Sequence, residues 1–411
     1  MTSEQLEILK EDWRYDTGVT HWDIGDTVKH ARWSGTEKWD HDHCTFCWKD
    51  FSNSPDDQHE GYCDPEEYCW ICEECFKDFK ELFEFKVILN PDDSERGWEV
   101  EEYHQNGTTI LHKAINKKEE AHMKPRVYFT REISPEAVLK MYKLLGRELK
   151  GNVAIKVHSG EVGNQNFLRP PFWKPVVDHV GGTVCECNTA YDGERDTTEK
   201  HLKAIAKHGW NDYFKFDLLD AEGPDLVLDI PNGKVIKKNY VGKNLTKYDS
   251  MLVLSHFKGH PMGGYGGAIK QLSIGVASSY GKAYIHGSGN TDQNIWAAPH
   301  DAFLESMADA ASSVIDFFKG EIVYINVMAN MSVDCDCCDV AEDPCMRDIG
   351  ILVSDDPIAI DQACLDLVYA ATDDPGRDHL LERIESRNGV HTIEAAAELG
   401  YGSREYELIE V

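Results

Sequence analysis

The stretch "MLVLSHFKGHPMGGYGGAIK", residues 251–270, begins with an apolar run and continues into a segment rich in glycine, histidine and lysine. A short apolar run that stops at glycine predicts a strand that is buried on both faces and ends in a loop. Strands of this kind belong to parallel sheets, in which ligands bind in the crevice at the carboxyl ends of the strands. The stretch therefore predicts a parallel sheet and also where to look for a site.

The same alternation of strands and helices continues from about residue 125 to the C-terminus. Further apolar runs predict strands at Val153–Val157, Thr183–Glu186, Ile322–Val327 and Ile349–Val353. Amphipathic stretches predict helices at Pro135–Leu149, Phe172–His179, Thr198–Lys207, Ala302–Phe318 and Ile360–Ala371. We predict an α/β domain over residues 124–411, with a mostly parallel sheet and helices on both faces.

The glycine-rich segment contains the candidates for catalysis. Its glycines permit the backbone to approach a ligand closely, although their spacing matches neither the P-loop nor the dinucleotide-binding fingerprint. The candidate ligand-binding glycines are Gly263, Gly264, Gly266 and Gly267. His260, Lys270 and His286 are candidate catalytic residues, because histidine transfers protons or binds metal near neutral pH and lysine holds anions or bonds to a cofactor. The alternative is a flexible loop with structural or solvated histidines.

Polar side chains also follow two other predicted strands. His158, Asn166 and Arg169 follow the first, and Asn188 follows the second. Arg169 precedes a predicted helix start, where it would suit a carboxylate or a phosphate. We expect these four residues to bind a substrate or cofactor, and we expect that ligand to be a small anionic molecule. Capping and loop packing are the alternative roles.

A second group of cysteines follows the strand predicted at Ile322–Val327, in "DCDCCDVAEDPC". Thiolates bind zinc and iron–sulfur clusters, and a C-x-C turn can present two of them to one ion. The candidate ligands are Cys335, Cys337, Cys338 and Cys345. We expect an iron–sulfur cluster or another metal here, and unliganded cysteines are the alternative.

The N-terminal part contains two C-x-x-C pairs, which are Cys44 with Cys47 and Cys72 with Cys75. Their separation matches the spacing at which four thiolates close a tetrahedral zinc site. The segment has few aliphatic residues, so we predict that zinc supplies much of its folding energy. Read from Cys69, the spacing Cys69-x-x-Cys72-x-x-Cys75 resembles part of an iron–sulfur motif, so an iron–sulfur cluster is the alternative to zinc.

Composition and length set the remaining limits. We place a Cys-rich, zinc-ribbon-like domain at residues 1–89 and a polar linker at residues 90–123. The formal net charge of -31 argues against nucleic acid and anionic membranes as partners. We expect a cytoplasmic protein, because the N-terminus has no apolar leader and clustered cysteines favour metal binding over disulfides in that compartment. The oligomeric state stays open.

Five ordered motifs carry a resemblance to a known family. They are "VHSGEVGNQNFLRP", "ECNTAY", "LSHFKGHPMGGYGGAIKQLSIGVAS", "DCDCC" and "IGILVSDDPIAIDQA". Together they resemble the family called domain of unknown function 362, over the chain from about Lys124 to its end. Members are often described as iron–sulfur center proteins, and many contain an inserted ferredoxin module after the glycine-rich loop. This chain has no cysteine in that region, "IHGSGNTDQNIW".

A weaker resemblance is to the nickel-pincer lactate racemase family. In that family a His-x-x-x-Gly-aromatic-x-Gly-Gly-x-Lys motif supplies a catalytic histidine and the lysine that attaches the pincer nucleotide. His260 and Lys270 are similar to these two, and His286 stands where that family has its nickel ligand. "NFLRP" is similar to the family's Asp-x-x-Arg-Pro segment, with Asn166 replacing the aspartate and Arg169 retained. The resemblance implies proton or hydride transfer at a carbon that bears a hydroxyl.

The sequence leaves three hypotheses for function. The first is a metal-binding enzyme that acts by redox or isomerisation chemistry on a small anionic substrate. The second is a non-catalytic metal-binding or electron-carrying protein, in which the cysteine clusters are the whole function. The third is a nickel-pincer racemase or epimerase of a 2-hydroxy acid.

Overall fold

The computed structural model describes residues 9–10, 12–33, 41–55, 57–65, 67–88, 98–105, 108–116 and 124–411. Contacts within the chain divide it into two compact units, residues 1–123 and residues 124–411. None of the described helices is long and apolar enough to cross a membrane.

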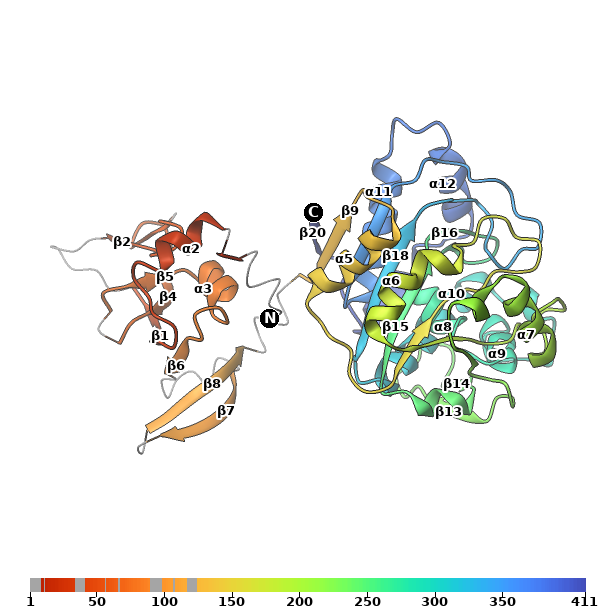
Figure 1. Ribbon diagram of the computed structural model, residues 1–411, viewed down its shortest axis with the longest axis horizontal. Coiled ribbons are helices and arrows are strands. Elements are labelled where there is room, and N and C mark those ends of the chain that lie inside the picture. The colour runs from red at the N-terminus through yellow and green to blue at the C-terminus, as the bar shows by residue number, and fades with distance from the viewer. Residues whose placement is uncertain are drawn as a thin grey trace. The chain divides into compact units, whose positions relative to one another are not determined.

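An eight-stranded sheet forms the centre of the C-terminal unit (Figure 1). Its strands are β9 (Arg126–Thr130), β10 (Val153–Lys156), β11 (Thr183–Glu186), β12 (Phe216–Leu218), β15 (Ser250–His256), β18 (Ile322–Met328), β19 (Gly350–Ser354) and β20 (Glu407–Glu410). Their order across the sheet is β12-β11-β10-β15-β18-β19-β9-β20. All pairings are parallel except the two that β19 makes with β18 and β9. The predicted mostly parallel sheet is confirmed.

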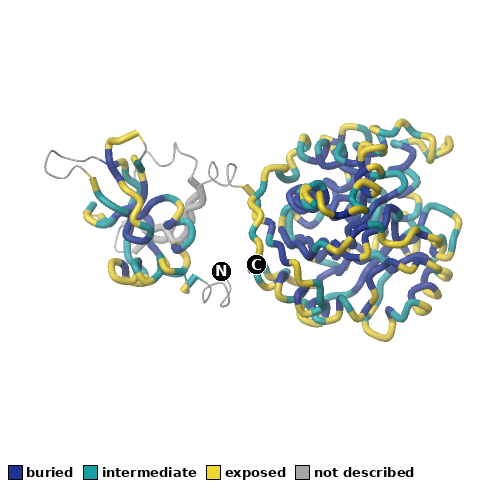
Figure 2. Tube along the Cα trace, turned by 90° about the horizontal axis from the view of Figure 1, so that it is seen from above, coloured by how far each residue is buried: buried dark blue, intermediate teal, exposed yellow. Residues whose placement is uncertain are grey.

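Helices cover both faces of this sheet, which confirms the predicted layers. They are α5 (Pro135–Leu145), α6 (Pro170–Val180), α7 (Thr198–Lys207), α8 (Ala268–Ser273), α9 (Ser279–His286), α10 (His300–Phe317), α11 (Pro357–Ala370), α12 (Arg377–Ser386) and α13 (His391–Glu398). Successive strand residues point to opposite faces, so each strand contributes to two cores. Leu252 of β15 packs in the core that contains α5 and α6, and Val253 packs in the core that contains α8, α10 and α11. The tube in Figure 2 shows the buried residues gathered inside this unit and the exposed ones around it.

Two hairpins lie beside the main sheet. β13 (Leu226–Asp229) pairs with β14 (Lys238–Val241), and β16 (Lys258–His260) pairs with β17 (Gly264–Gly266). The glycine-rich segment is therefore an ordered hairpin that leads into α8 rather than a flexible loop.

The strand order reverses between β10 and β15. From β10 the chain moves outward through β11 to β12, then returns to add β15 and β18 on the other side of β10. The loops that leave the carboxyl ends of β10 and β15 diverge, and a crevice opens between them, as is general for such sheets.

The N-terminal unit has a smaller sheet with strand order β5-β4-β1-β6-β8-β7. Its elements are α2 (Trp13–Gly18), β1 (Thr27–Arg32), β2 (His41–His43), β3 (Asp50–Ser52), β4 (Glu60–Cys63), β5 (Trp70–Ile71), α3 (Glu73–Phe79), β6 (Lys86–Ile88), β7 (Trp98–Gln105) and β8 (Thr108–Asn116). Its core is mainly aromatic side chains and cysteines. The segment expected to be a linker contains the hairpin β7–β8, and β8 pairs with β6. Its other residues lie outside the described ones.

Candidate functional site

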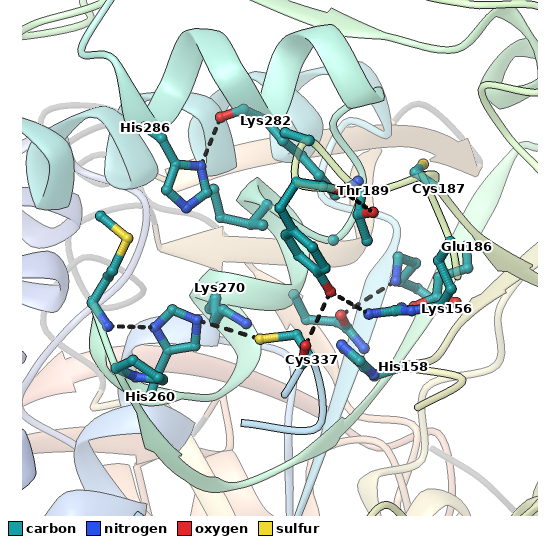
Figure 3. A pocket seen from close by; sticks show the side chains of 18 of the residues that line it. Lys156, His158, Glu186, Cys187, Thr189, His260, Lys270, Lys282, His286 and Cys337 are labelled. Atoms are coloured by element: carbon teal, nitrogen blue, oxygen red, sulfur yellow. Dashed lines mark hydrogen bonds and ion pairs between the residues drawn. The ribbon is translucent and has the colours of Figure 1, made fainter. Parts of the chain in front are cut away.

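A pocket lies in this crevice, at the carboxyl ends of β10 and β11 and beside the segments that follow β15 and β18 (Figure 3). Its cavity volume is about 230 Å³, which is room for a small organic molecule rather than for one or two waters. His158, His260, Lys270 and His286, all candidates from the sequence, line this single pocket. The rule that places ligands at the carboxyl ends of parallel strands therefore locates it correctly.

The glycine-rich hairpin brings two of these residues to the pocket. His260 ends β16, and Lys270 lies in the first turns of α8, which follows β17 directly. Asp361 of α11 fixes the start of α8, because its carboxylate accepts the backbone N–H groups of Ala268 at 2.7 Å and Ile269 at 3.0 Å. This buried carboxylate thus sets the position from which Lys270 projects.

The glycines of the hairpin are not among the residues that line the pocket, and their expected role in ligand binding stays a prediction. They let the backbone pack closely against other parts of the chain. Gly264 has a φ of +77°, and a Cβ there would lie 2.8 Å from the Cα of Gly389. A Cβ on Gly267 would overlap the carboxylate of Asp361, and one on Gly266 would lie 3.4 Å from the Cδ of Lys270. Gly263 contributes its backbone N–H group, which donates a hydrogen bond to His260.

That N–H fixes the protonation of His260. The Nδ1 atom of His260 accepts the backbone N–H of Gly263 at 2.8 Å and that of Met262 at 3.2 Å. Burial, followed by the positive charge of Lys270, lowers the pKa of His260 to about 4, so the ring is neutral near pH 7. A neutral ring whose Nδ1 accepts must have its proton on Nε2. His260 therefore presents an N–H group to its neighbours.

Those neighbours are two thiols. The Sγ atom of Cys337 lies 4.0 Å from the Nε2 of His260, and the Nζ of Lys270 donates to the Sγ of Cys335 at 3.4 Å. One nitrogen of His260 and the two sulfurs lie within 4.8 Å of one another, a group that could hold a metal ion. Burial by itself opposes ionisation of Cys335, but the hydrogen bond from Cys337 and the charges of Lys270 and Lys258 lower its pKa well below the usual value. These charges therefore favour the thiolate form of Cys335.

The residue between these cysteines orients the turn. The carboxylate of Asp336 is buried and lies 3.0 Å from the Nδ1 of His256 and 2.9 Å from the Nζ of Lys258. These cations lower the pKa of Asp336 against the effect of burial. The backbone N–H of Cys338 donates to the carbonyl of Cys335 at 3.0 Å and closes this turn, in which the sulfurs of Cys335 and Cys337 lie together beside His260.

The other two cysteines of this loop lie outside the group of ligand atoms. The thiol of Cys345 donates to the carbonyl of Met331 at 3.3 Å, and Cys338 has its backbone carbonyl bound by Asn164. Asn166, expected to touch substrate, instead donates to the carbonyl of Glu342 at 2.7 Å. Its role is to hold the cysteine loop in place.

Two further candidates lie away from the pocket. Arg169 is exposed, and its guanidinium stacks on Phe167 at 3.8 Å from the ring centroid. Asn188 binds the hydroxyl of Thr198 at 3.0 Å and the ring of His201. Neither residue lines this pocket, so their expected role in binding a substrate or cofactor stays a prediction.

His286 is oriented in the opposite sense to His260. Its Nδ1 donates to the carbonyl of Lys282 at 2.7 Å, so its Nε2 carries a lone pair. Burial lowers the pKa of His286 to about 3, and the ring stacks on Phe303. A histidine whose second nitrogen donates to a carbonyl is the usual form of a metal ligand.

A buried ionic network that the sequence did not predict forms another part of the lining. The carboxylate of Glu186 accepts from Arg195 at 3.0 Å and from His201 at 2.9 Å, and it is also bound by the hydroxyl of Ser159. Arg195 also binds Glu161 at 3.1 Å. The sequence offered little to find this network, since Ser159 and Glu161 follow β10 whereas Glu186, Arg195 and His201 belong to the segment from β11 to α7.

Two buried lysines also escaped prediction. Lys156 ends β10 and Lys282 lies in α9, and both line the pocket. Lys156 could have been noticed, because a lysine inside an otherwise apolar strand is rarely buried without a purpose.

The N-terminal unit contains a separate cluster of four thiols, Cys44, Cys47, Cys72 and Cys75, within 4.8 Å of one another. The sulfurs of Cys47 and Cys72 are 3.7 Å apart. Tetrahedral zinc with bonds of about 2.3 Å separates its sulfurs by about 3.8 Å, so this set fits the ion. Hydrogen bonds among the thiols lower the pKa of Cys44 and raise that of Cys75. The first thiol proton of this cluster therefore leaves easily, and the last thiol proton leaves when a metal cation takes its place.

The chain belongs to the family described as Domain of unknown function (DUF362), whose model matches residues 153–366. The matched segment spans all the strands from β10 to β19 and every residue that lines the pocket.

Two solved structures are similar over part of their length. One is the lactate racemase apoprotein from Thermoanaerobacterium thermosaccharolyticum, at 15% identity and a TM-score of 0.33, covering 56% of this chain and 55% of that one. The other is a protein from Thermotoga maritima, at 10% identity and a TM-score of 0.34, covering 64% of this chain and 58% of that one. The chain thus spans little more than half of either structure. No curated protein matches the sequence.

Proposed function

We propose that the C-terminal unit is an enzyme that acts by redox or isomerisation chemistry on a small anionic molecule. One observation carries the proposal. His260, Lys270 and Cys337 converge in one pocket at the point where the strand order reverses. A proton donor, a cation and a thiol are groups that an enzyme uses together.

The arrangement divides the chemistry between named groups. His260 is neutral and holds its proton on Nε2, so near pH 7 it can donate a hydrogen bond to a substrate oxygen or to a thiolate. Lys270 stabilises negative charge, whether on Cys335 or on a substrate oxygen. A pocket of this kind has no purpose in a pure electron carrier, which supports the enzyme over the second hypothesis.

An iron–sulfur cluster fits the second cysteine group poorly. Such a cluster is held by four thiolates. In residues 124–411 only Cys335 and Cys337 come together with His260, and the proton on Nε2 of His260 faces the sulfurs. A metal held by the two thiolates is compatible with the group, and its identity is a matter for measurement.

A nickel-pincer racemase or epimerase of a 2-hydroxy acid is the second candidate, and the orientation of His286 favours it. The Nε2 lone pair of this buried histidine is free to bind a metal, and Lys270 lines the same pocket for attachment of the nucleotide. The bound cofactor would supply hydride chemistry at the substrate carbon. Through its Nε2–H group, His260 would then hydrogen-bond to the hydroxyl oxygen of that acid.

The test begins with protein purified without oxygen. Its nickel, zinc, iron and sulfide are measured, and the mass of the peptide that contains Lys270 is determined. The protein is then incubated in deuterated water with a panel of small 2-hydroxy acids, 2-oxo acids and other carboxylates. Proton NMR follows deuterium entering at carbon, together with any conversion.

We expect turnover of at least one acid, and a loss of at least about 100-fold in the His260→Gln variant. His379→Gln is the matched control, because that histidine is exposed and does not line the pocket. Full activity in His260→Gln would reject the proposal. Nickel together with a nucleotide adduct on Lys270 would put the racemase candidate first.

A further inference from the structure

Two buried lysines at the β10 and β11 end of the pocket form no ion pair with a carboxylate among the residues that the structure describes. The Nζ of Lys156 donates to the carbonyl of Val157 at 2.5 Å and to the side-chain oxygen of Gln271 at 3.3 Å. The Nζ of Lys282 donates to the carbonyl of Ala277 at 2.6 Å. Lys156 is wholly buried and Lys282 is 8% exposed.

The two ammonium groups have more N–H donors than acceptors in contact with them. Each ammonium has three N–H groups. Lys156 uses two of them and Lys282 uses one, so three donors remain for a ligand. Charged groups are almost never fully buried unless they are paired, and breaking such a pair is costly.

The carboxylate that lines this end of the pocket, Glu186, makes its ion pairs with other groups. Both oxygens of Glu186 are already bound, one by Arg195 and the other by His201 and Ser159. Burial lowers the pKa of Lys156 to about 8 and also lowers that of Lys282, and the charge of Glu186 offsets only part of this effect. An anion from outside the chain would complete the set.

We infer that Lys156 and Lys282 form an oxyanion subsite that binds a carboxylate or phosphate group of the substrate. Lys270 lies at the other end of the pocket, beside the thiols (Figure 3). A substrate anchored on Lys156 and Lys282 would extend its reacting carbon toward His260 and Cys337. The subsite rests on the proposed function, since it gives that enzyme its anionic substrate class.

The experiment measures binding of two probes, inorganic phosphate and acetate, to the full chain by calorimetry. The variants are Lys156→Gln and Lys282→Gln. Lys203→Gln is the control, because it removes the same charge from an exposed lysine that pairs with Glu199 on the surface. Cys337→Ser tests the other end of the pocket. Circular dichroism checks that each variant is folded.

We expect saturable binding of at least one probe, and the probe that binds more tightly identifies the oxyanion. Affinity should fall at least about tenfold in either pocket variant, because a charge-assisted hydrogen bond is lost. It should change less than about twofold in Lys203→Gln and in Cys337→Ser, since neither touches the anion.

Absence of saturable binding by the wild-type chain would overturn the subsite, and so would unchanged affinity in both pocket variants. Should Lys156→Gln fail to fold, Lys282→Gln decides the matter alone. The result is separate from the proposed function, which fails if His260→Gln retains turnover even where the anion binds.

Discussion

The two thiol sites of this chain are built differently. Cys44, Cys47, Cys72 and Cys75 form a closed set in which every ligand is a thiol, and none of them lines the pocket of the C-terminal unit. The site of Cys335 and Cys337 has only two thiols, and it opens into a pocket lined by His260 and Lys270.

This difference separates a structural role from a chemical one. A closed set of four ligands satisfies a metal completely, so the ion can only stabilise the fold. A set with an open side and a neighbouring cation retains reactivity, and the surrounding fold must supply its stability. The three predictions that follow test this contrast, beginning with the largest effect.

The largest expected effect comes from breaking the closed site. Cys75→Ser, or removal of zinc by a strong chelator, should unfold the N-terminal unit, since structural zinc contributes on the order of 10 kcal/mol to such small domains. The four-thiol set should hold about one zinc per chain before treatment. Metal analysis and limited proteolysis provide the measurement.

The C-terminal unit provides the internal reference for this experiment. Its large aliphatic cores contain none of the four thiols, so its resistance to protease should be unchanged. An N-terminal unit that stays protected without metal would show that its aromatic core suffices, and the structural role of the ion would be lost.

The fold of the C-terminal unit was accessible from sequence because its strands are apolar and its helices amphipathic. The run Met251–Ser255 is buried on both sides in the structure, which is what makes a parallel strand recognisable. The N-terminal thiols were accessible for a similar reason, since the C-x-x-C spacing is local in the chain. Local patterns of this kind survive in a single sequence.

The residues of the pocket could be predicted from the sequence only in part. His260, Lys270 and His286 were found because they lie on one continuous segment with an unusual composition. Lys156 and Arg195 were missed, because what distinguishes them is burial beside partners that are remote in sequence. The glycines were expected to bind a ligand, whereas in the structure they let the backbone pack closely on other parts of the chain. Such packing demands glycine as strongly as ligand binding does.

The second prediction concerns the reactivity of the open site. Lys270→Met removes the cation that contacts Cys335, so the pKa of that thiol should rise and less thiolate should exist at pH 7. We expect the midpoint of the pH dependence of alkylation at Cys335 to rise by about one unit, which corresponds to about 1.4 kcal/mol. Mass spectrometry of labelled peptides follows each cysteine separately.

The cysteines of the closed site serve as the control, because metal-bound thiolates should label slowly in both proteins. Lys174→Met offers a matched variant, since that lysine is exposed and pairs with Asp178 on the surface. Equal labelling rates in wild type and Lys270→Met would mean that Lys270 does not activate the thiols.

The smallest effect should have the opposite sign to the first. Lys156→Met removes a buried ammonium that lacks an anionic partner, so the ligand-free chain should become more stable. Lowering the pKa of Lys156 from 10.5 to about 8 corresponds to a cost of about 3 kcal/mol for the charged form. Losing the donors to Val157 and Gln271 offsets part of that gain, and we expect a net increase of about 1 kcal/mol.

The pH dependence of the difference in unfolding free energy between Lys156→Met and wild type checks the sign of this effect. Below pH 8 the lysine is charged in both states, so its burial cost is fully present and the variant should have its largest advantage. Between pH 8 and 10.5 the unfolded chain holds a proton that the folded chain has released, so wild-type stability should rise relative to the variant. Urea unfolding at several pH values measures the difference. A variant that is less stable than wild type at pH 7 would mean that Lys156 contributes to the fold, as the closed thiol site does, rather than to the ligand.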